Sequence, residues 1–258
     1  MKKLLALMLS ALVVILGACG TSDDNSAKSG SSDKKVLVMG TSADYAPFEY
    51  IDTAKSDEII GFDVDLANAL GEKLGYEIQV KDMDFSGLIS ALQSEKVDIV
   101  LSSMSPTKER AKNVDFSDVY YEARDLVVTA KDSKINGISD LKGKTVGVQL
   151  GSIQADAAKE INEQVKITIE NRDRIPELVE EIKAGRMDAA VIEEVVAQGY
   201  LNKDDTLSSF PAKEDAEGNG TAIAFPKGSD LTEKFNAELQ KMKDSGELDE
   251  LIVKWFGN

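Results

Sequence analysis

An arginine and a glutamate occupy corresponding places in two similar halves of this chain. Residues 88–100 and residues 178–190 each read as an amphipathic helix, a short basic turn, an aspartate and an apolar strand. The first strand runs out just ahead of Arg110, and the second ends at Glu193. Open α/β sheets bind ligands beyond the carboxyl ends of their strands, so both charges are expected to face one crevice. A cation and an anion on opposite walls suit a small zwitterion such as a free amino acid.

The residues ahead of Arg110 predict an anion site. The run S-S-M-S-P-T-K-E-R places Ser105 and Pro106 where an N-cap and the first residue of a helix are expected. Hydroxyl and free N–H groups at a helix N-terminus bind anions, and the planar fork of an arginine matches a carboxylate. The alternative is that Arg110 forms only a surface salt bridge with Glu109 or Asp115. The matching position in the two halves favours a binding role.

A second strand-to-helix junction, V-G-V-Q-L-G-S-I-Q, supplies further hydrogen-bonding groups. Ser152 is expected to cap the following helix and to offer its hydroxyl group to a ligand, and the two roles are compatible. Gln149 and Gln154 are polar candidates nearby. On the anionic wall, Glu194 competes with Glu193. Side chains alternate along a strand, so only one of these carboxylates is expected to face the crevice.

Two aromatic residues complete the candidate site. Tyr45 lies near the carboxyl end of the first strand, and Phe85 lies at the start of a helix. A facing aromatic pair would hold an apolar stem or stack on a guanidinium group. The alternative for each ring is simple packing in the core. Asp44 is either a charge partner or a turn residue.

The elements that position these residues alternate between strand and helix, which is typical of an α/β fold. One helix is expected to have Asp63 as its N-cap and to stop at Gly75. The expected strands are 36–41, 76–80, 97–101, 126–130, 145–149, 165–169, 188–192 and 221–225. The other expected helices are 85–94, one from Pro106, 152–161, 175–183, 231–242 and 248–255.

The two similar halves predict two lobes. The trailing strand and helices have no third unit to join, so they are expected to return to the first lobe. We therefore assign residues 36–123 and 218–258 to lobe 1 and residues 124–217 to lobe 2. The chain would then cross between the lobes twice, and a two-strand hinge of this kind allows the lobes to close over a ligand.

The N-terminal residues are interpreted as a targeting segment. Residues 1–18 contain two lysines followed by an apolar stretch, as in a signal peptide, and the stretch is too short to predict a membrane span. The sequence L-G-A-C resembles a bacterial lipobox, in which Cys19 carries the lipid; the alternative is an ordinary secretory signal. Residues 19–35 are rich in Ser, Asp, Gly and Lys, which predicts a flexible tether.

Composition excludes several classes of protein. The chain has a formal net charge of −16, no histidine and one cysteine. Without histidine, a Ser-His-Asp triad, a Cys-His pair and a His-ligated zinc or iron site are excluded. A single cysteine excludes an internal disulfide. The negative charge argues against nucleic acid or an anionic membrane surface as a partner. We expect no enzyme activity, no cofactor and no metal.

Several motifs, in one order, resemble the polar amino-acid solute-binding proteins of ABC importers. They are G-T-S-A-D-Y-A-P-F-E-Y, G-F-D-V-D-L-A, S-S-M-S-P-T-K-E-R, V-D-F-S-D-V-Y-Y, L-K-G-K-T-V-G-V-Q-L-G-S and K-W-F-G. Among members, the chain is most similar to Gram-positive lipoproteins that bind arginine. The resemblance implies a two-lobed fold of the periplasmic-binding-protein type II class.

By matching position, the resemblance also implies roles for single residues. Arg110 would clamp the ligand carboxylate, and Glu193, at a position that is Asp in many members, would hold the α-ammonium group. Taken together, the expected ligand-binding set is Ser42, Tyr45, Phe85, Ser103, Met104, Ser105, Arg110, Gln149, Ser152 and Glu193. Basic-amino-acid binders of enteric type carry Asp at the position of Ser42. That motif therefore does not supply the acid that would meet a guanidinium group.

We expect an extracytoplasmic lipoprotein, anchored through Cys19 to a cell membrane of Gram-positive type. It would capture a polar amino acid, arginine or another basic one, as a monomer and deliver it to an ABC permease. Two other classes stay open: a dehydratase-like enzyme, with Glu193 and Arg110 as acid/base and carboxylate clamp, and a sensor or adhesin. Fold alone does not separate these classes.

Overall fold

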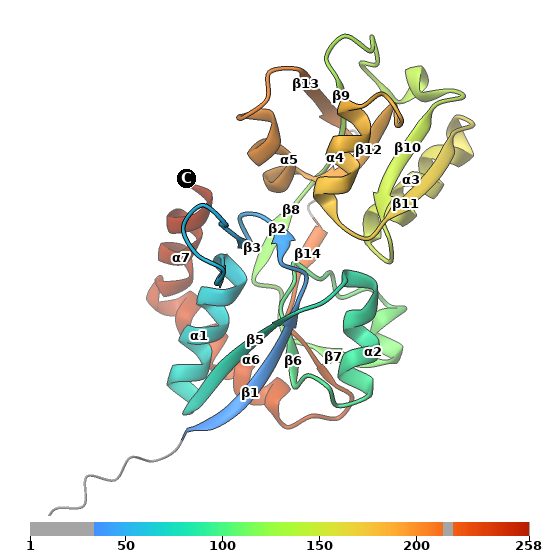
Figure 1. The fold of residues 1–258 in the computed structure, drawn as a ribbon. Coiled ribbons are helices and arrows are strands. Elements are labelled where there is room, and N and C mark those ends of the chain that lie inside the picture. The colour runs from blue at the N-terminus through green and yellow to red at the C-terminus, as the bar shows by residue number, and fades with distance from the viewer. Residues whose placement is uncertain (1–33, 214–218, 258) are drawn as a thin grey trace, which may run out of the picture. The chain divides into compact units, whose positions relative to one another are not determined.

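The computed structural model describes residues 34–213 and 219–257. The predicted signal peptide, Cys19 and most of the predicted tether lie outside the described residues. Within the described ranges, no helix is both long enough and apolar enough to cross a membrane. Two five-stranded sheets with helices on their faces make this an α/β fold, as predicted (Figure 1).

The first five-stranded sheet has the strand order β5-β1-β6-β15-β7. Its strands are β1 (Lys35–Thr41), β5 (Tyr76–Asp82), β6 (Ile99–Val100), β7 (Val114–Phe116) and β15 (Ala224–Pro226). β1 runs parallel to β5 and β6. β15 follows the second sheet in the chain, yet it inserts antiparallel between β6 and β7.

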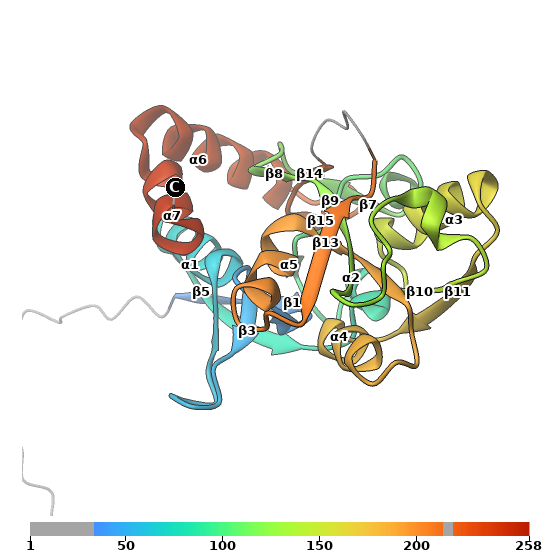
Figure 2. The same cartoon turned by 90° about the horizontal axis from the view of Figure 1, so that it is seen from above.

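Helices cover both faces of this sheet. They are α1 (Phe62–Leu74), α2 (Leu88–Gln93), α6 (Leu231–Ser245), α7 (Glu247–Phe256) and the short 3-10 helix η1 (Phe85–Gly87). α1, α6 and α7 contact one another and gather on one side (Figure 2). Ile99 of β6 shares a hydrophobic cluster with these helices, whereas Val100 shares one with α2. Successive strand residues thus face opposite helix layers.

The second five-stranded sheet has the strand order β11-β10-β12-β9-β13. Its strands are β9 (Asp125–Ala130), β10 (Thr145–Gln149), β11 (Thr168–Arg172), β12 (Ala189–Glu193) and β13 (Leu207–Pro211). Its helices are α3 (Ile153–Gln164), α4 (Ile175–Lys183), α5 (Glu194–Leu201) and the 3-10 helix η3 (Ile138–Leu141). β10 is parallel to β11 and β12, and β9 is antiparallel to β12 and β13. All of β12 is buried, including its final residue, Glu193, which places an acidic side chain at the end of an apolar strand.

The chain passes between the two sheets twice. β8 (Tyr121–Ala123) leads toward the second sheet and β14 (Asn219–Thr221) leads back. The two segments pair antiparallel, with Asn219 opposite Ala123. The fold is therefore two-lobed with a two-strand hinge. We call the elements around the first sheet the first lobe and those around the second sheet the second lobe.

Several elements of the structure differ from the sequence expectations. The expected strand 221–225 is divided between β14 and β15. β11 starts later than expected because the N–H group of Val165 still bonds to the carbonyl oxygen of Ile161 at the end of α3, at 2.8 Å. The short strands β2 (Asp44–Tyr45), β3 (Glu49–Ile51) and β4 (Ile59–Ile60) form a further sheet that no periodic pattern indicated.

The helix expected from Pro106 is absent. Only the 3-10 helix η2 (Arg110–Lys112) forms in this segment. The N–H group of Thr107 bonds to the carbonyl oxygen of Ser105 at 2.9 Å, which closes a three-residue turn instead of a helical one. The prediction that a helix N-terminus forms an anion site here is therefore wrong. Arg110 lies in this segment without such a helix.

The N-cap predicted for α1 is also wrong. Gly61 caps this helix, and Asp63 is its second residue. Gly61 has φ +141, and a Cβ there would lie 2.0 Å from the carbonyl oxygen of Phe48, so the close approach of the chain requires glycine. The stop at Gly75 is confirmed, with φ 78 at the C-cap.

Candidate functional site

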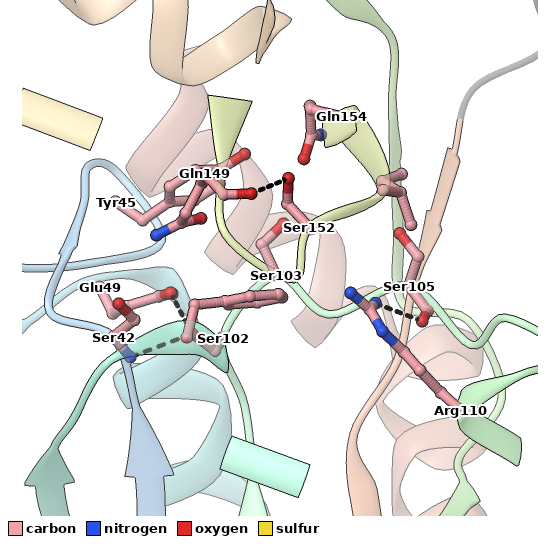
Figure 3. Close-up of a pocket in the computed structure, with 12 residues that line it drawn as sticks. Ser42, Tyr45, Glu49, Ser102, Ser103, Ser105, Arg110, Gln149, Ser152 and Gln154 are labelled. Carbon is pink, nitrogen blue, oxygen red and sulfur yellow. Dashed lines mark hydrogen bonds between the residues drawn. The ribbon is translucent and has the colours of Figure 1, made fainter. Parts of the chain in front are cut away.

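One pocket gathers residues from both lobes (Figure 3). Eight of the predicted residues line it: Ser42, Tyr45, Phe85, Ser103, Ser105, Arg110, Gln149 and Ser152. Glu49, Ser102, Ile153 and Gln154 also line it, of which all except Glu49 lie in the two runs singled out from the sequence. The predicted residues Met104 and Glu193 are not among those that line it. The pocket lies where β1 and β6 end in the first lobe and where β10 meets α3 in the second.

Arg110 is a buried cation on one wall of this pocket. It is 9% exposed, and its Nη1 and Nη2 atoms donate to the carbonyl oxygens of Ser105 at 2.8 Å and Gly151 at 2.9 Å. Its guanidinium carbon lies 5.3 Å from the centre of the Phe85 ring. Burial lowers the pKa of Arg110 to about 10, which still leaves it charged at neutral pH. A guanidinium group has more N–H donors than the two used here, so it can also bind a carboxylate.

The surface salt bridge considered for Arg110 does not form. Glu109 pairs with Lys112 instead, and Asp115 pairs with Lys227 at 2.7 Å. Arg110 is held by backbone carbonyl groups of both lobes.

Glu193 is the acidic counterpart of Arg110, and it also joins the two lobes. Its Oε2 atom accepts hydrogen bonds from the hydroxyl groups of Ser103 at 2.9 Å and Tyr45 at 3.2 Å. Its Oε1 atom is buried and has no hydrogen-bond partner among the described residues. Burial raises the pKa of Glu193 to about 8, against the lowering effect of the bond from Ser103. An ammonium group at Oε1 would favour the charged form.

Glu193 and Glu194 differ in burial, but strand alternation is not the reason. Glu194 is the first residue of α5 and is only partly buried, and its N–H group bonds to the carbonyl oxygen of Arg124 at 2.7 Å. The strand ends between the two residues, so strand alternation does not separate them.

Two buried acids that the sequence did not reveal lie beside this site. Glu49 is fully buried; its Oε1 atom accepts from the Ser102 hydroxyl group at 2.8 Å, and its Oε2 atom has no partner among the described residues. Burial raises the pKa of Glu49 well above its usual value, and Asp63 raises it further. Because Glu49 lies on a short strand without a periodic pattern, no local signal pointed to it.

Asp63 binds the turn after β6 rather than capping the N-terminus of α1. Its carboxylate accepts from the N–H group of Ser103 at 2.8 Å and from the Tyr120 hydroxyl group at 2.8 Å. Burial raises its pKa to about 6. Ser103 has φ 43, in the left-handed region that few residues other than glycine adopt. The bond to Asp63 stabilises this turn, which directs the Ser103 hydroxyl group toward Glu193.

The polar residues of the second lobe lie as predicted at the β10–α3 junction. Ser152 caps α3: its oxygen accepts from the N–H group of Ala155 at 3.3 Å, and its hydroxyl group donates to the carbonyl oxygen of Gln149 at 2.8 Å. Gln149 donates to the carbonyl oxygen of Asp173 at 3.1 Å, and Gln154 donates to the Asp125 carboxylate at 2.8 Å.

Met104 and Ser42 have surroundings that the sequence did not indicate. Met104 is 1% exposed and packs in the cluster that contains Phe85, Leu88 and Val100, so it lies behind the pocket rather than on its wall. The Ser42 hydroxyl group donates to Asp44 at 2.7 Å. No cluster of three or more potential metal ligands occurs in the described part of the chain.

Comparisons with known proteins match this architecture. Residues 37–258 match the model of the bacterial extracellular solute-binding proteins, family 3. The "arginine-binding extracellular protein ArtP" of Bacillus subtilis (strain 168) is 54% identical over 99% of this chain and 98% of its own length. The crystal structure of the substrate-binding protein of an amino acid ABC transporter is 42% identical with a TM-score of 0.81, over 86% of this chain and 100% of that one. An ancestral arginine-binding protein bound to arginine is 41% identical with a TM-score of 0.79, over 86% and 98%.

Proposed function

Since the chain belongs to the bacterial extracellular solute-binding proteins of family 3, we propose that it captures free L-arginine for an ABC importer. The name of its B. subtilis relative and the arginine-bound structure support this ligand. These relatives are named as binding proteins, which favours capture without turnover over the dehydratase alternative.

The α-carboxylate and α-ammonium groups of the ligand would bind between the lobes. Arg110 supplies a buried guanidinium group for the carboxylate, with the hydroxyl groups of Ser105 and Ser152 beside it. Glu193 supplies the anion for the ammonium group. The observation that carries the proposal is the buried Oε1 atom of Glu193, which no described residue satisfies. A buried polar atom of this kind is costly unless a ligand group bonds to it.

The guanidinium end of the ligand would meet Glu49. This residue lines the pocket and has a second buried carboxylate oxygen without a partner in the described part of the chain. It would replace the acid that enteric basic-amino-acid binders carry at the position of Ser42. Tyr45 and Phe85 would form the apolar walls, and a planar guanidinium group is more weakly hydrated than the ammonium group of lysine. We therefore expect arginine to bind more tightly than lysine or histidine.

The lobes would close on the ligand, which bonds to both and so favours the closed state. In this proposal residues 36–123 and 218–258 form one moving part and residues 124–217 the other. Residues 1–18 would direct export, and lipid on Cys19, outside the described residues, would anchor the monomer through the 19–35 tether to the outer face of the membrane. The partner in this proposal is the membrane permease of the ABC importer, to which the protein would deliver the amino acid.

Calorimetry on the chain without its first 19 residues tests the ligand. L-arginine, L-lysine, L-histidine, L-glutamine and L-cystine are titrated separately, and each is also tested by thermal shift, because a ligand of the native state raises apparent stability. L-arginine is expected to bind most tightly. Tighter binding of glutamine or cystine would overturn the ligand while leaving an amino-acid-binding role.

Labelled palmitate tests the anchor. The full chain expressed in a Gram-positive host should take up the label and sediment with membranes, whereas Cys19→Ser should do neither. Label in the Cys19→Ser variant, or no label in the wild type, would contradict lipidation at this residue.

A further inference from the structure

A single arginine of the second lobe faces a group of acids on the first lobe. Arg174 lies at the N-cap of α4. Its Nε atom donates to Asp84 at 2.9 Å, and its Nη1 and Nη2 atoms donate to the two carboxylate oxygens of Asp82 at 2.9 and 3.3 Å. Nη1 also lies 3.4 Å from a carboxylate oxygen of Asp44. One guanidinium group is thus shared by three carboxylates of the other lobe.

A backbone bond lies beside this cluster. The N–H group of Ile175 donates to the other carboxylate oxygen of Asp44 at 2.7 Å. Asp44 is 9% exposed at its side chain, and Arg174 is 24% exposed. Burial opposes the charge on Arg174, but the bonds to Asp82 outweigh it and raise the pKa of Arg174. Asp82 and Asp84 are 39% and 55% exposed at their side chains, so only the contact with Asp44 is better shielded from water and salt than an ordinary surface pair.

The cluster is connected to the ligand pocket without lining it. The Ser42 hydroxyl group, on the pocket wall, donates to Asp44 at 2.7 Å and lies 3.5 Å from Nη1 of Arg174. Tyr45, which follows Asp44, reaches across to Glu193. A contact between Arg174 and Asp44 thus fixes two residues that would touch the ligand. It also engages Asp44, which is then not free to bind the ligand side chain.

We propose that Arg174 is an interlobe latch that holds the two lobes together and slows the release of the captured amino acid. The inference rests on the proposed function in that it takes the pocket to hold an amino acid. Opening the lobes would separate Arg174 from Asp82, Asp84 and Asp44 at the same time. The latch therefore acts on dissociation, and Arg174 is a positioning residue that does not contact the ligand.

Dissociation kinetics of L-arginine test the latch. Arg174→Gln is expected to raise the dissociation rate about tenfold and to change the association rate far less, as for a charged group whose bonds break on release. Arg174→Lys should recover part of the loss. The matched control is Arg186→Gln, which removes the same charge and a bidentate pair with Glu181 that lies within the second lobe. Equal dissociation rates for wild type, Arg174→Gln and Arg186→Gln would overturn the latch.

Amide hydrogen exchange at Ile175 provides a test that needs no ligand. Arg174→Gln should make this amide exchange about tenfold faster, and Arg186→Gln should leave it as in the wild type. An unchanged rate in Arg174→Gln would contradict the latch. If wild-type protein does not bind L-arginine, the proposed ligand fails, whereas the exchange rates at Ile175 still decide for or against the latch.

Discussion

The segments around the end of β6 in the first lobe and the end of β12 in the second lobe have the same backbone arrangement but different side chains. In each lobe an aspartate ahead of the strand accepts a backbone bond from the neighbouring strand: Asp98 from Val38 at 2.7 Å, and Asp188 from Thr145 at 2.8 Å. The chain then differs at matching positions: Ser103, three residues past the end of β6, carries a hydroxyl group, whereas Glu193, the last residue of β12, carries a carboxyl group. This backbone arrangement determines where the two residues lie, and the side chain of each determines what it can bind.

The two ends meet directly. The Ser103 hydroxyl group donates to Glu193 at 2.9 Å, and these residues are 90 positions apart, the offset of the two similar halves. The positional counterpart of Glu193 is therefore Ser103, and the predicted correspondence between Arg110 and Glu193 is wrong. Equivalent positions of the two lobes are thus in direct contact beside the pocket that Ser103 lines. This arrangement lets one lobe supply hydroxyl groups and Arg110 while the other supplies the carboxylate.

The turns before the two strands are also alike. Glu95 and Gly185 both have positive φ, of 56 and 67. The N–H groups of the next residues, Lys96 and Arg186, bond to carbonyl oxygens at 2.9 Å in the last turn of α2 and α4. This is the pattern of a Schellman motif, in which glycine is preferred at the left-handed position. The first lobe forms it with a glutamate.

Replacing Arg110, the cation near the β6 end, should cause the largest loss of ligand affinity. Arg110→Ala is expected to weaken L-arginine binding by about 2–5 kcal/mol, because a desolvated charge pair with the ligand carboxylate is lost. Calorimetry is the measurement, with Arg186→Ala as a control for the loss of an exposed arginine. Unchanged affinity in a folded Arg110→Ala variant would remove Arg110 from the site.

Replacing the buried acid beside the β6 end should change specificity. Glu49→Gln is expected to reduce the preference for L-arginine over L-citrulline by about 1.5–3 kcal/mol, the range for hydrogen bonds to charged groups. Citrulline is the matched ligand because its side chain is neutral and of similar shape. Glu58→Gln, at an exposed position of the same hairpin region, is the control. If the preference persists in Glu49→Gln, another group meets the guanidinium.

The acid at the β12 end should make the unliganded protein less stable as pH rises. Burial raises the pKa of Glu193 from 4.5 to about 8, so between these values the folded protein retains a proton that the unfolded chain has lost. The free energy of unfolding therefore falls across this window, by up to about 1.4 kcal/mol per pH unit. Urea denaturation at several pH values should show a shallower fall in Glu193→Gln, which keeps Asp63 and Glu49. Parallel curves for the two proteins would contradict the buried, titrating carboxylate.

The smallest effects should come from exchanging the turn residues. Glu95→Gly is expected to stabilise the protein by about 0.5–1 kcal/mol, because glycine adopts positive φ without strain. Gly185→Ala should destabilise it by about 1 kcal/mol, since a Cβ there meets no atom within 4 Å and only the backbone conformation is strained. Thermal denaturation of the wild type and the two variants measures these changes in stability. Changes of the same sign would show that the two turns are not equivalent.

The sequence predicted the elements whose burial follows a period and the charges at strand ends. The strand 145–149 and the helix 175–183 are found at those bounds, because each is a long apolar pattern with clear stops. Glu193 could be selected because it ends an apolar strand and Arg110 because it follows one, since ligands bind beyond the carboxyl ends of such strands.

The parts that could not be predicted depend on contacts between distant residues. An aspartate ahead of an apolar stripe is typical of an N-cap, so nothing local showed that Asp63 bonds to Ser103, 40 residues away. Glu49 is likewise defined by Ser102, 53 residues away. The sequence made no prediction for the latch residue Arg174, because its partners Asp82 and Asp84 lie 92 and 90 residues away.

The most direct test of the account is whether Glu193 recognises the amino group of the ligand. Wild type and Glu193→Gln are titrated by calorimetry with L-arginine and with guanidinovalerate, which is arginine without its α-amino group. Glu193→Gln is expected to weaken the binding of L-arginine by about 1.5–3 kcal/mol and to leave the binding of guanidinovalerate nearly unchanged, while Glu194→Gln should change the binding of neither ligand. An equal loss for both ligands, or a loss that appears in Glu194→Gln instead, would contradict it.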